Sequence, residues 1–377
     1  MLMDFFEVEN FRSLKHLKLE KLARVNLLVG KNNSGKTSVL EALFSIVNIE
    51  TEKWLKPIDD ARRLGSEDED FRLLFYNFDS GLSIKITSKY KGNDDEADLK
   101  IQATLKILDK PSLADPSEKG SLERLVSSMR KPIAPFVLRV ELVHPYASQT
   151  PVYDIIRKGP YGSQLIGTPK DDFTKDFLNK FEDSVAFQRN LTSRISTEIE
   201  PYYLGKDLEM LKVAKQDKFL INIIKNVDPR IESYDLGSNS EVYLNLGEEF
   251  KRLSPLSLLG EGIQRLFAIL ASAANTAGGI LLIDEIDNGL HYSALRILWK
   301  GILQAAREYD VQIFATTHSA EALRHLTWVL DDEENTSYRE DVAAYTLIRA
   351  DDDTVRSYRH DYGQLEYALE HGIEVRN

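Results

Sequence analysis

Apolar and polar side chains alternate along several stretches in the first half of the chain. Residues 82–90 and 99–108 alternate with a period of two, which predicts two strands joined by a polar turn at 92–96. The same pattern predicts strands at 5–8, 14–22 and 136–143, of which the first two are expected to form a hairpin beside the strand at 25–29. These strands favour an antiparallel sheet.

Continuous apolar runs dominate the rest of the chain. Runs at 25–29, 278–283 and 311–317 predict buried strands of a parallel sheet. Each is accompanied by a segment with apolar residues every three or four positions, which predicts helices packed on that sheet. Two hairpins, at 231–246 and 342–358, and a short final helix at 364–372 complete the pattern.

Residues 170–227 differ in character, since aromatic residues recur every four positions and predict a compact helical insertion. The aromatic stripe, interpreted as a packed helix face, consists of three phenylalanines and the valine that continues their spacing: Phe173, Phe177, Phe181 and Val185. We therefore expect an N-terminal part at 1–169, the insertion at 170–227 and a C-terminal part at 228–377.

Composition excludes several classes of protein. The 377 residues contain no cysteine, which removes disulfides, cysteine-ligated metals and cysteine nucleophiles. No apolar run reaches the roughly 20 residues of a membrane span, and no secretory start is present, so a cytoplasmic protein without a membrane partner is expected. The net charge of −12 argues against a bulk electrostatic grip on nucleic acid, although a local basic groove stays compatible with it.

The loop after the strand at 25–29 matches the spacing G-x-x-x-x-G-K-[ST]. The backbone N–H groups of such a loop surround a polyphosphate at a helix N-terminus, where the dipole favours anions. Lys36 would reach the β- and γ-phosphates of ATP, and the Thr37 hydroxyl would bind Mg²⁺. The expected nucleotide-binding residues are Gly30, Asn32, Asn33, Ser34, Gly35, Lys36, Thr37 and Ser38. The alternative is a glycine-rich turn that carries a lysine.

Two carboxylates follow the apolar run at 278–283. Ligand chemistry lies at the carboxyl ends of parallel strands, and phosphoryl transfer needs charge neutralisation and an aligned nucleophile. Asp284 would therefore hold Mg²⁺ through water, and Glu285 would orient or deprotonate the attacking water. A strand that simply ends at the solvent is the alternative.

Longer motifs resemble a known family. The opening F-E-V-E-N-F-R-S-L-K, followed by N-L-L-V-G-K-N-N-S-G-K-T-S-V-L-E-A-L, resembles the start of RecF/OLD-type ATPases of the ABC class, which are related to SMC proteins. The motifs I-D-E-I-D-N-G-L-H and L-L-G-E-G-I-Q-R-L are most similar to the AAA15/OLD-like branch. The resemblance implies an α/β fold, namely an ABC-type P-loop ATPase head with a mixed central sheet, a flanking antiparallel β-sheet and a compact helical insertion.

The resemblance also implies roles for individual residues. His318 resembles the switch histidine, which contacts the γ-phosphate and acts with Lys36 and Glu285 in catalysis. The signature, at the start of the helix that precedes the apolar run at 278–283, would hold the γ-phosphate of ATP on a second copy, and its residues here are Gly260, Glu261 and Gly262. Leu258 stands where the family has serine, so backbone N–H groups would have to make that contact; a glycine-containing helix cap is the alternative.

Other family features match less well. His291 replaces the closing aspartate of the D-loop at 286–291. Asn77 and Gln188 are candidates for the Q-loop residue, and a structural role explains each of them as well. Asp351 and Asp353 form a D-x-D pair of the kind that binds Mg²⁺, which we interpret as a turn.

The family resemblance suggests how such an ATPase would act. OLD proteins continue into a Toprim nuclease domain, for which the tail of this sequence has too few residues. We therefore expect a homodimer or higher oligomer, closed around two ATP molecules, that controls a separately encoded effector, in the manner of ATPase subunits of multi-gene anti-phage defence systems. The effector is expected to be a nuclease.

Two alternatives stay open. The first is a RecF-like DNA-repair ATPase that contacts DNA directly, which a surface stripe of lysine and arginine would favour. The second is a self-sufficient nuclease, which the short tail disfavours.

Overall fold

The computed structural model describes residues 2–48, 71–92, 98–108, 137–143, 152–157, 163–166, 192–195 and 201–376. The α-helices are α1 (Lys36–Val47), α5 (Pro201–Val213), α6 (Asp217–Ile224), α7 (Glu261–Asn275), α8 (Tyr292–Glu308), α9 (Ala320–Asp331) and α10 (Tyr362–Glu370). The strands are β1 (Leu2–Phe11), β2 (Leu14–Glu20), β3 (Val25–Val29), β4 (Ile84–Lys91), β5 (Leu99–Leu108), β6 (Val137–Val143), β7 (Val152–Arg157), β8 (Ser163–Ile166), β9 (Thr192–Ile195), β10 (Ser233–Leu236), β11 (Val242–Asn245), β12 (Ser254–Pro255), β13 (Ile280–Ile283), β14 (Gln312–Thr317), β15 (Val342–Arg349) and β16 (Val355–His360).

The central sheet has the strand order β16-β15-β3-β14-β13-β9. Its neighbours pair in parallel from β15 to β9, and only the edge strand β16 is antiparallel. The short strands β3, β13 and β14 are buried along their whole length, as their uninterrupted apolar runs predicted. The expected α/β class with a mixed central sheet is therefore confirmed.

A second, seven-stranded sheet has the order β2-β1-β4-β5-β6-β7-β8 and is antiparallel throughout. The predicted strands at 82–90 and 99–108 are confirmed as β4 and β5, which pair from Ile84↔Leu105 to Tyr90↔Leu99. The predicted N-terminal hairpin is also present as β1 and β2. Its expected place was wrong, because it belongs to this sheet, whereas the neighbours of β3 are β14 and β15.

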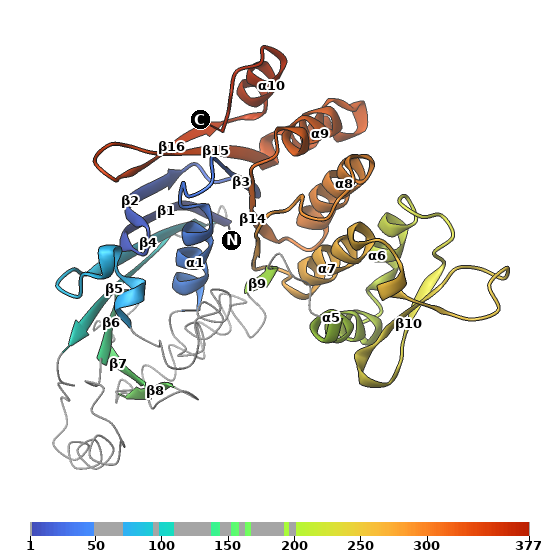
Figure 1. The fold of residues 1–377 in the computed structure, drawn as a ribbon, viewed down its shortest axis with the longest axis horizontal. Helices are drawn as coiled ribbons and strands as arrows, with labels where there is room; N and C mark the ends of the chain where they lie inside the picture. Colours follow the sequence, from blue (N-terminus) through green and yellow to red (C-terminus); the bar gives the residue numbers. More distant parts are fainter. Residues whose placement is uncertain are drawn as a thin grey trace.

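Helix α1 lies between the two sheets (Figure 1). Its apolar residues pack in one core with the inner face of the antiparallel sheet and with one face of the central sheet. The opposite face of the central sheet carries a second core, to which α7, α8, α9 and α10 contribute. The helix that begins at the phosphate loop is thus held on both sides.

The range 170–227 was expected to be helical, and its described part is more mixed. Helices α5 and α6 pack against α7 in the second core, whereas β9 forms the edge of the central sheet beside β13. The aromatic stripe of the expected insertion lies outside the described residues, and the boundaries 170 and 227 stay a prediction.

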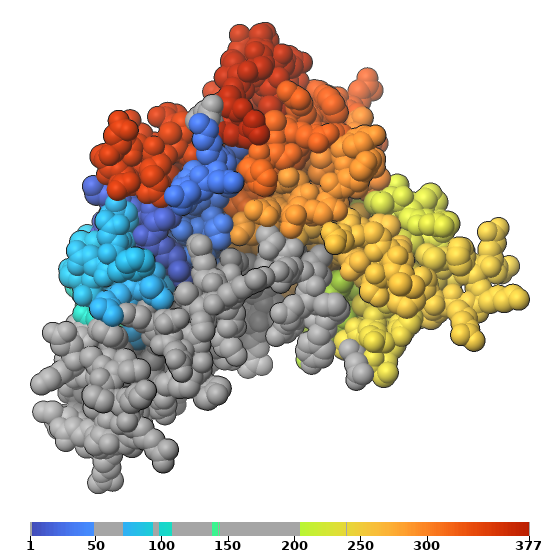
Figure 2. Space-filling model, in the orientation of Figure 1, coloured from blue at the N-terminus to red at the C-terminus, as the bar shows by residue number. Residues whose placement is uncertain are grey.

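The hairpin of β15 and β16 folds over the start of the chain (Figure 2), where orange-red atoms lie directly against blue and cyan ones. Among the hydrogen bonds between them, Arg349 donates to the Ser13 carbonyl at 3.0 Å and Lys15 donates to the Asp352 carbonyl at 3.1 Å. Farther along the chain, the Tyr76 hydroxyl donates to Asp353 at 2.9 Å. The turn of this hairpin is therefore tied to the segment that precedes the phosphate loop.

Within the described ranges, no helix combines the length and apolar character needed to cross a bilayer.

Candidate nucleotide site

The loop between β3 and α1 is shaped by two glycines with positive φ, 157° at Gly30 and 97° at Gly35. A Cβ atom on Gly30 would lie 2.7 Å from the carbonyl oxygen of Leu347 in β15, and one on Gly35 would lie 2.8 Å from Leu14. The loop therefore packs too closely beneath the hairpins for side chains at these positions. Gly35 is the N-cap of α1 and makes no side-chain cap, so the start of the helix is left to a ligand in the cavity that Gly35, Lys36 and Thr37 line.

Lys36 is the first residue of α1. Its ammonium donates to the carbonyl oxygens of Gly30 and Lys31 at 2.7 and 2.8 Å. Burial lowers the pKa of Lys36, and the negative charges of Asp284 and Glu285 oppose that shift. The lysine is therefore held by its own loop, close enough to the two carboxylates to feel their charge.

Asp284 and Glu285 follow β13 and are fixed by one hydroxyl. Thr316, in the neighbouring strand β14, donates to Asp284 Oδ1 at 2.6 Å and accepts the Glu285 N–H at 2.8 Å. Glu285 has a φ of 48°, which is unusual for a residue with a side chain. Such strain is typical of functional sites, where the surrounding contacts over-determine the backbone.

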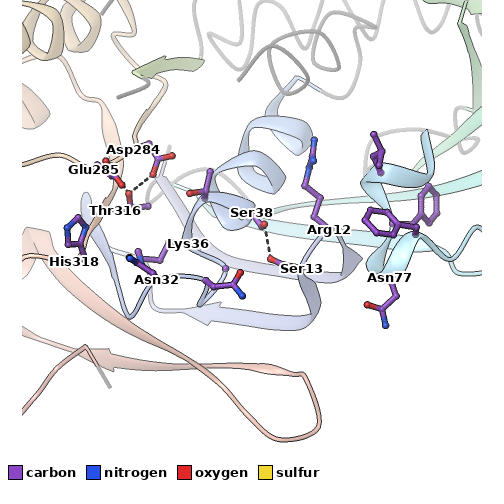
Figure 3. Close-up of a pocket in the computed structure, with 16 residues that line it drawn as sticks. Arg12, Ser13, Asn32, Lys36, Ser38, Asn77, Asp284, Glu285, Thr316 and His318 are labelled. Atoms are coloured by element: carbon purple, nitrogen blue, oxygen red, sulfur yellow. Dashed lines mark hydrogen bonds between the residues drawn. The ribbon is translucent and has the colours of Figure 1, made fainter. Parts of the chain in front are cut away.

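His318 follows β14, and its side chain is exposed at the same end of the central sheet. It lies near Thr316 and the two carboxylates, with Lys36 and Asn32 opposite (Figure 3). The carboxyl ends of β3, β13 and β14 therefore bring three of the predicted catalytic residues, which are far apart in the sequence, into one place.

These residues line a cavity of about 600 Å³, which is within the range of small-molecule sites. The lining residues are Arg12, Ser13, Asn32, Asn33, Gly35, Lys36, Thr37, Ser38, Leu73, Phe75, Asn77, Phe78, Asp284, Glu285, Thr316 and His318. Most of the loop residues predicted from the motif are among them. Gly30 and Ser34 belong to the same loop, but they are buried and do not line the cavity.

The far end of the cavity is aromatic and strained. Asn77 and Phe78 have consecutive positive φ values of 52° and 58°, and Phe78 is 64% exposed although it is large and apolar. The turn is held from both sides, because the Arg12 N–H donates to the Leu74 carbonyl at 2.7 Å and Tyr76 donates to Asp353. A flat apolar ligand group would fit this end of the cavity.

The donor set suits a hard metal ion. The Thr37 hydroxyl and the carboxylates of Asp284 and Glu285 line one cavity, and oxygen ligands of this kind are those that Mg²⁺ prefers. Thr316 orients Asp284 by a hydrogen bond to one oxygen. Thr37 and Asp284, predicted as metal ligands, are therefore compatible with that role.

The predicted signature residues lie outside the cavity. Gly260 is the N-cap of α7, Glu261 contacts Gly289, and Gly262 lies against Leu290, so the segment adjoins the 286–291 loop of its own chain. Leu258 just before it is 76% exposed. This surface could contact a nucleotide only on another molecule.

Arg265 was not singled out from the sequence. It lies on α7, is 2% exposed, and donates to the carbonyl oxygens of Asp284 and Glu285 at 2.8 and 2.6 Å. It therefore ties the helix that begins at the signature to the strand end that carries the carboxylates. The arginine in L-L-G-E-G-I-Q-R-L, beside a helix start, was the available signal.

Three weaker candidates can now be placed. Asn77 lines the cavity, and Gln188 lies outside the described residues. The D-x-D pair lies in the turn between β15 and β16, where Asp353 accepts from Tyr76 and lies 3.6 Å from Arg349. These contacts favour the turn interpretation over a metal site.

Comparison with known proteins gives one family. Residues 25–324 match the family profile described as "AAA domain, putative AbiEii toxin, Type IV TA system". An "ATP/GTP phosphatase" of Helicobacter pylori is 23% identical over 96% of both chains. A "DNA replication and repair protein RecF" of Leptospira interrogans is 23% identical over 89% of this chain and 96% of its own.

Among solved structures, the SMC head domain from Thermotoga maritima aligns over 96% of this chain and 100% of its own, with 11% identity and a TM-score of 0.46.

Proposed function

Because the chain belongs to the AAA domain family described as "putative AbiEii toxin, Type IV TA system", we propose that it is an ATP-driven regulatory subunit that controls a partner effector in defence against phage. The chain is an ATPase of the ABC and RecF type. One observation carries the part of the proposal that concerns ATP: Lys36, Thr37 and the Asp284–Glu285 pair line a single cavity of nucleotide size.

The motif residues around the cavity divide the work of hydrolysis. The loop N–H groups and Lys36 bind the β- and γ-phosphates, since Lys36 can exchange its contacts with Gly30 and Lys31 for phosphate oxygens. Glu285, held by Thr316, orients the attacking water and accepts its proton. His318 contacts the γ-phosphate. Thr37 and Asp284 would hold Mg²⁺, which would supply positive charge to the phosphoryl transfer when bound.

The aromatic end of the cavity binds the base. Phe78 is exposed, and Phe75 and Leu73 line the same cavity. Stacking on an aromatic ring is favourable for any base, so this contact adds affinity without selecting one base strongly. The backbone strain at Asn77 and Phe78 is consistent with a site shaped for a ligand.

A second copy completes the site. The N-terminus of α7 lies outside the cavity, with Leu258 exposed. Apart from its chain neighbours, none of the described residues comes within 4 Å of the position that a Cβ on Gly260 would take. A helix N-terminus with free space around it can receive an anion. We propose that each copy presents this end to the γ-phosphate held by the other, so that ATP closes a homodimer or a higher oligomer.

The output of hydrolysis passes to another protein. The family description names a toxin of a toxin–antitoxin system, which favours a role in defence over a role in metabolism. We propose that the effector is a separately encoded nuclease. Pull-down of the tagged chain with the product of the neighbouring gene, with and without ATP, tests this partner. Nuclease activity of the chain alone would contradict it.

Two substitutions test the ATPase itself. Lys36→Ala should abolish ATP binding in a calorimetric titration, and Glu285→Gln should keep ATP binding while hydrolysis falls by about 100-fold or more. Lys300→Ala, which removes a surface lysine paired with Glu334, is the control and should behave as the wild type. Normal hydrolysis by Glu285→Gln would overturn the assignment.

Direct DNA binding is the second candidate. The RecF relative aligns over most of the chain, and Lys85, Lys89 and Lys100 line one hollow on the antiparallel sheet. Glu7 and Glu9 line the same hollow and offset part of that charge, so this candidate ranks second. Fluorescence anisotropy with a DNA duplex at two salt concentrations tests it, since phosphate contacts weaken steeply with salt.

A further inference from the structure

The segment Glu374–Arg376 lies beside the candidate site, although none of its residues lines the cavity. Arg376 Nη1 donates to the carbonyl oxygen of His318 at 3.0 Å. Its Nε and Nη2 atoms donate to the two carboxylate oxygens of Glu374, each at 2.6 Å. A paired, planar contact of this kind holds the guanidinium in one orientation.

The segment is anchored to the central sheet. Val375 is 4% exposed, and its carbonyl oxygen accepts from the Thr346 hydroxyl in β15 at 2.6 Å. Glu374 and Arg376 therefore flank a fixed point. Because Val375 is fixed, the backbone of Arg376 starts from a defined position, and its guanidinium reaches the His318 carbonyl from there.

The carboxylate of Glu374 is held in its charged form by its own arginine. Hydrogen bonds from Arg376 lower the pKa of Glu374 to about 2. The pair therefore stays charged at neutral pH, and the contact that joins it to the candidate site is the hydrogen bond from Arg376 to the His318 carbonyl.

The His318 carbonyl belongs to the peptide that joins β14 to α9. The next residue, Ser319, caps α9 by accepting the Ala322 N–H at 3.1 Å, and its own N–H donates to Thr317. Rotation of this peptide would turn the Cα–Cβ bond of His318 and move the imidazole relative to Glu285. The hydrogen bond from Arg376 to the His318 carbonyl opposes that rotation.

We propose that Arg376 is a positioning residue for His318, and that Glu374, Val375 and Arg376 form a clasp that sets the imidazole relative to Glu285. This inference rests on the proposed hydrolysis of ATP. The clasp does not touch the nucleotide, and the phosphate loop with Lys36 supplies the main contacts to the phosphates, so the clasp acts mainly on turnover.

Arg376→Ala tests the clasp. The expected kcat is lower by about 10-fold, as for other residues that orient a functional side chain, with the KM for ATP unchanged. In a His318→Ala background the same substitution should cause no further loss, because its effect passes through the imidazole. Arg376→Lys should restore part of the rate, since an ammonium can donate to the carbonyl but cannot pair with both oxygens of Glu374.

Arg339→Ala is a matched control. Arg339 also donates to a backbone carbonyl, that of Leu330, and to a carboxylate, that of Asp331, but on the outer surface at the end of α9. It should leave kcat unchanged. Independent, multiplicative losses from Arg376→Ala and His318→Ala, or an unchanged kcat for Arg376→Ala, would overturn the clasp.

A second readout separates this inference from the proposed function. In ATP-free protein with ¹⁵N-labelled histidine, Arg376→Ala should shift the His318 ring resonances and leave those of His291 in place. Unshifted His318 resonances would overturn the clasp even in an active enzyme. If the wild type hydrolyses no ATP while Arg376→Ala still shifts the His318 ring resonances, the proposed function is rejected. The clasp would then still stand.

Discussion

Thr316 shows how much of the site depends on one side chain. Its hydroxyl donates to Asp284 and accepts from the Glu285 N–H, so it fixes the metal-side carboxylate and the catalytic one at once. The spacing of the sequence could predict Lys36 and the two carboxylates, because each stands in a short motif beside a strand. It could not predict Thr316, whose partners are 31 and 32 residues away in sequence and meet it only because β13 and β14 pair in parallel.

Thr316→Val should lower kcat by about 10- to 100-fold with little change in KM, since misplaced carboxylates lose alignment with the attacking water. Thr316→Ser should keep most of the rate. Thr276→Val is a matched control, because Thr276 is equally buried and donates to a helix carbonyl at 2.7 Å away from the site. Steady-state kinetics of the three variants measure the effect, and equal rates for Thr316→Val and Thr276→Val would contradict it.

At the scale of elements, helix α7 connects two functional regions. It begins at the exposed Gly260, and one turn later its Arg265 binds the carbonyl oxygens at the end of β13. A movement of the helix start would therefore reach the carboxylates through a buried guanidinium.

Arg265→Met should separate binding from turnover. Methionine keeps the apolar stem and loses the hydrogen bonds to three carbonyl oxygens, those of Asp284, Glu285 and Ile286, so the free energy of unfolding should fall by about 2 kcal/mol. ATP binding should persist while kcat falls. Arg307→Met, which removes an exposed arginine that donates to the Ser337 carbonyl, is the control. Urea unfolding and ATPase assays measure both quantities, and an unchanged kcat would show that α7 does not position the carboxylates.

Elements with a strong period were predictable, and the rest were not. The alternation in β4 and β5 marks a half-buried sheet, and the turn residues between β10 and β11 mark a hairpin, which the structure confirms. The strand β9 has four residues and no sustained pattern, so its place in the central sheet could not be read from the sequence. Likewise, alternation in β1 and β2 predicts strands without stating which sheet they join.

For the whole molecule, the main prediction concerns assembly. Leu258 is exposed at the helix start that the proposed dimer buries against a second copy. The Glu285→Gln protein with Leu258 unchanged should form a dimer in the presence of ATP. Leu258→Asp should weaken that dimer by about 10-fold or more, because a charge would be buried without a partner.

The control for this test is Val213→Asp at the end of α5, which exchanges another exposed apolar residue, 80% accessible, for the same charge. Sedimentation of each variant measures the fraction of dimer. Titration of each variant with ATP checks that the cavity still binds the nucleotide. A Leu258→Asp protein that dimerises as well as the Val213→Asp control would place the interface elsewhere.

The position of β3 in the central sheet has a consequence for biosynthesis. This strand carries the phosphate loop near the start of the chain, yet its partners are β14 and β15, and Asn26 bonds to Ile313 across 287 residues of sequence. Contacts between such distant segments form late, because the intervening chain must first be made and its loop closed. A nascent chain on the ribosome therefore exposes the phosphate loop without a sheet to hold it, and competence for ATP arises only after β14 and β15 have emerged.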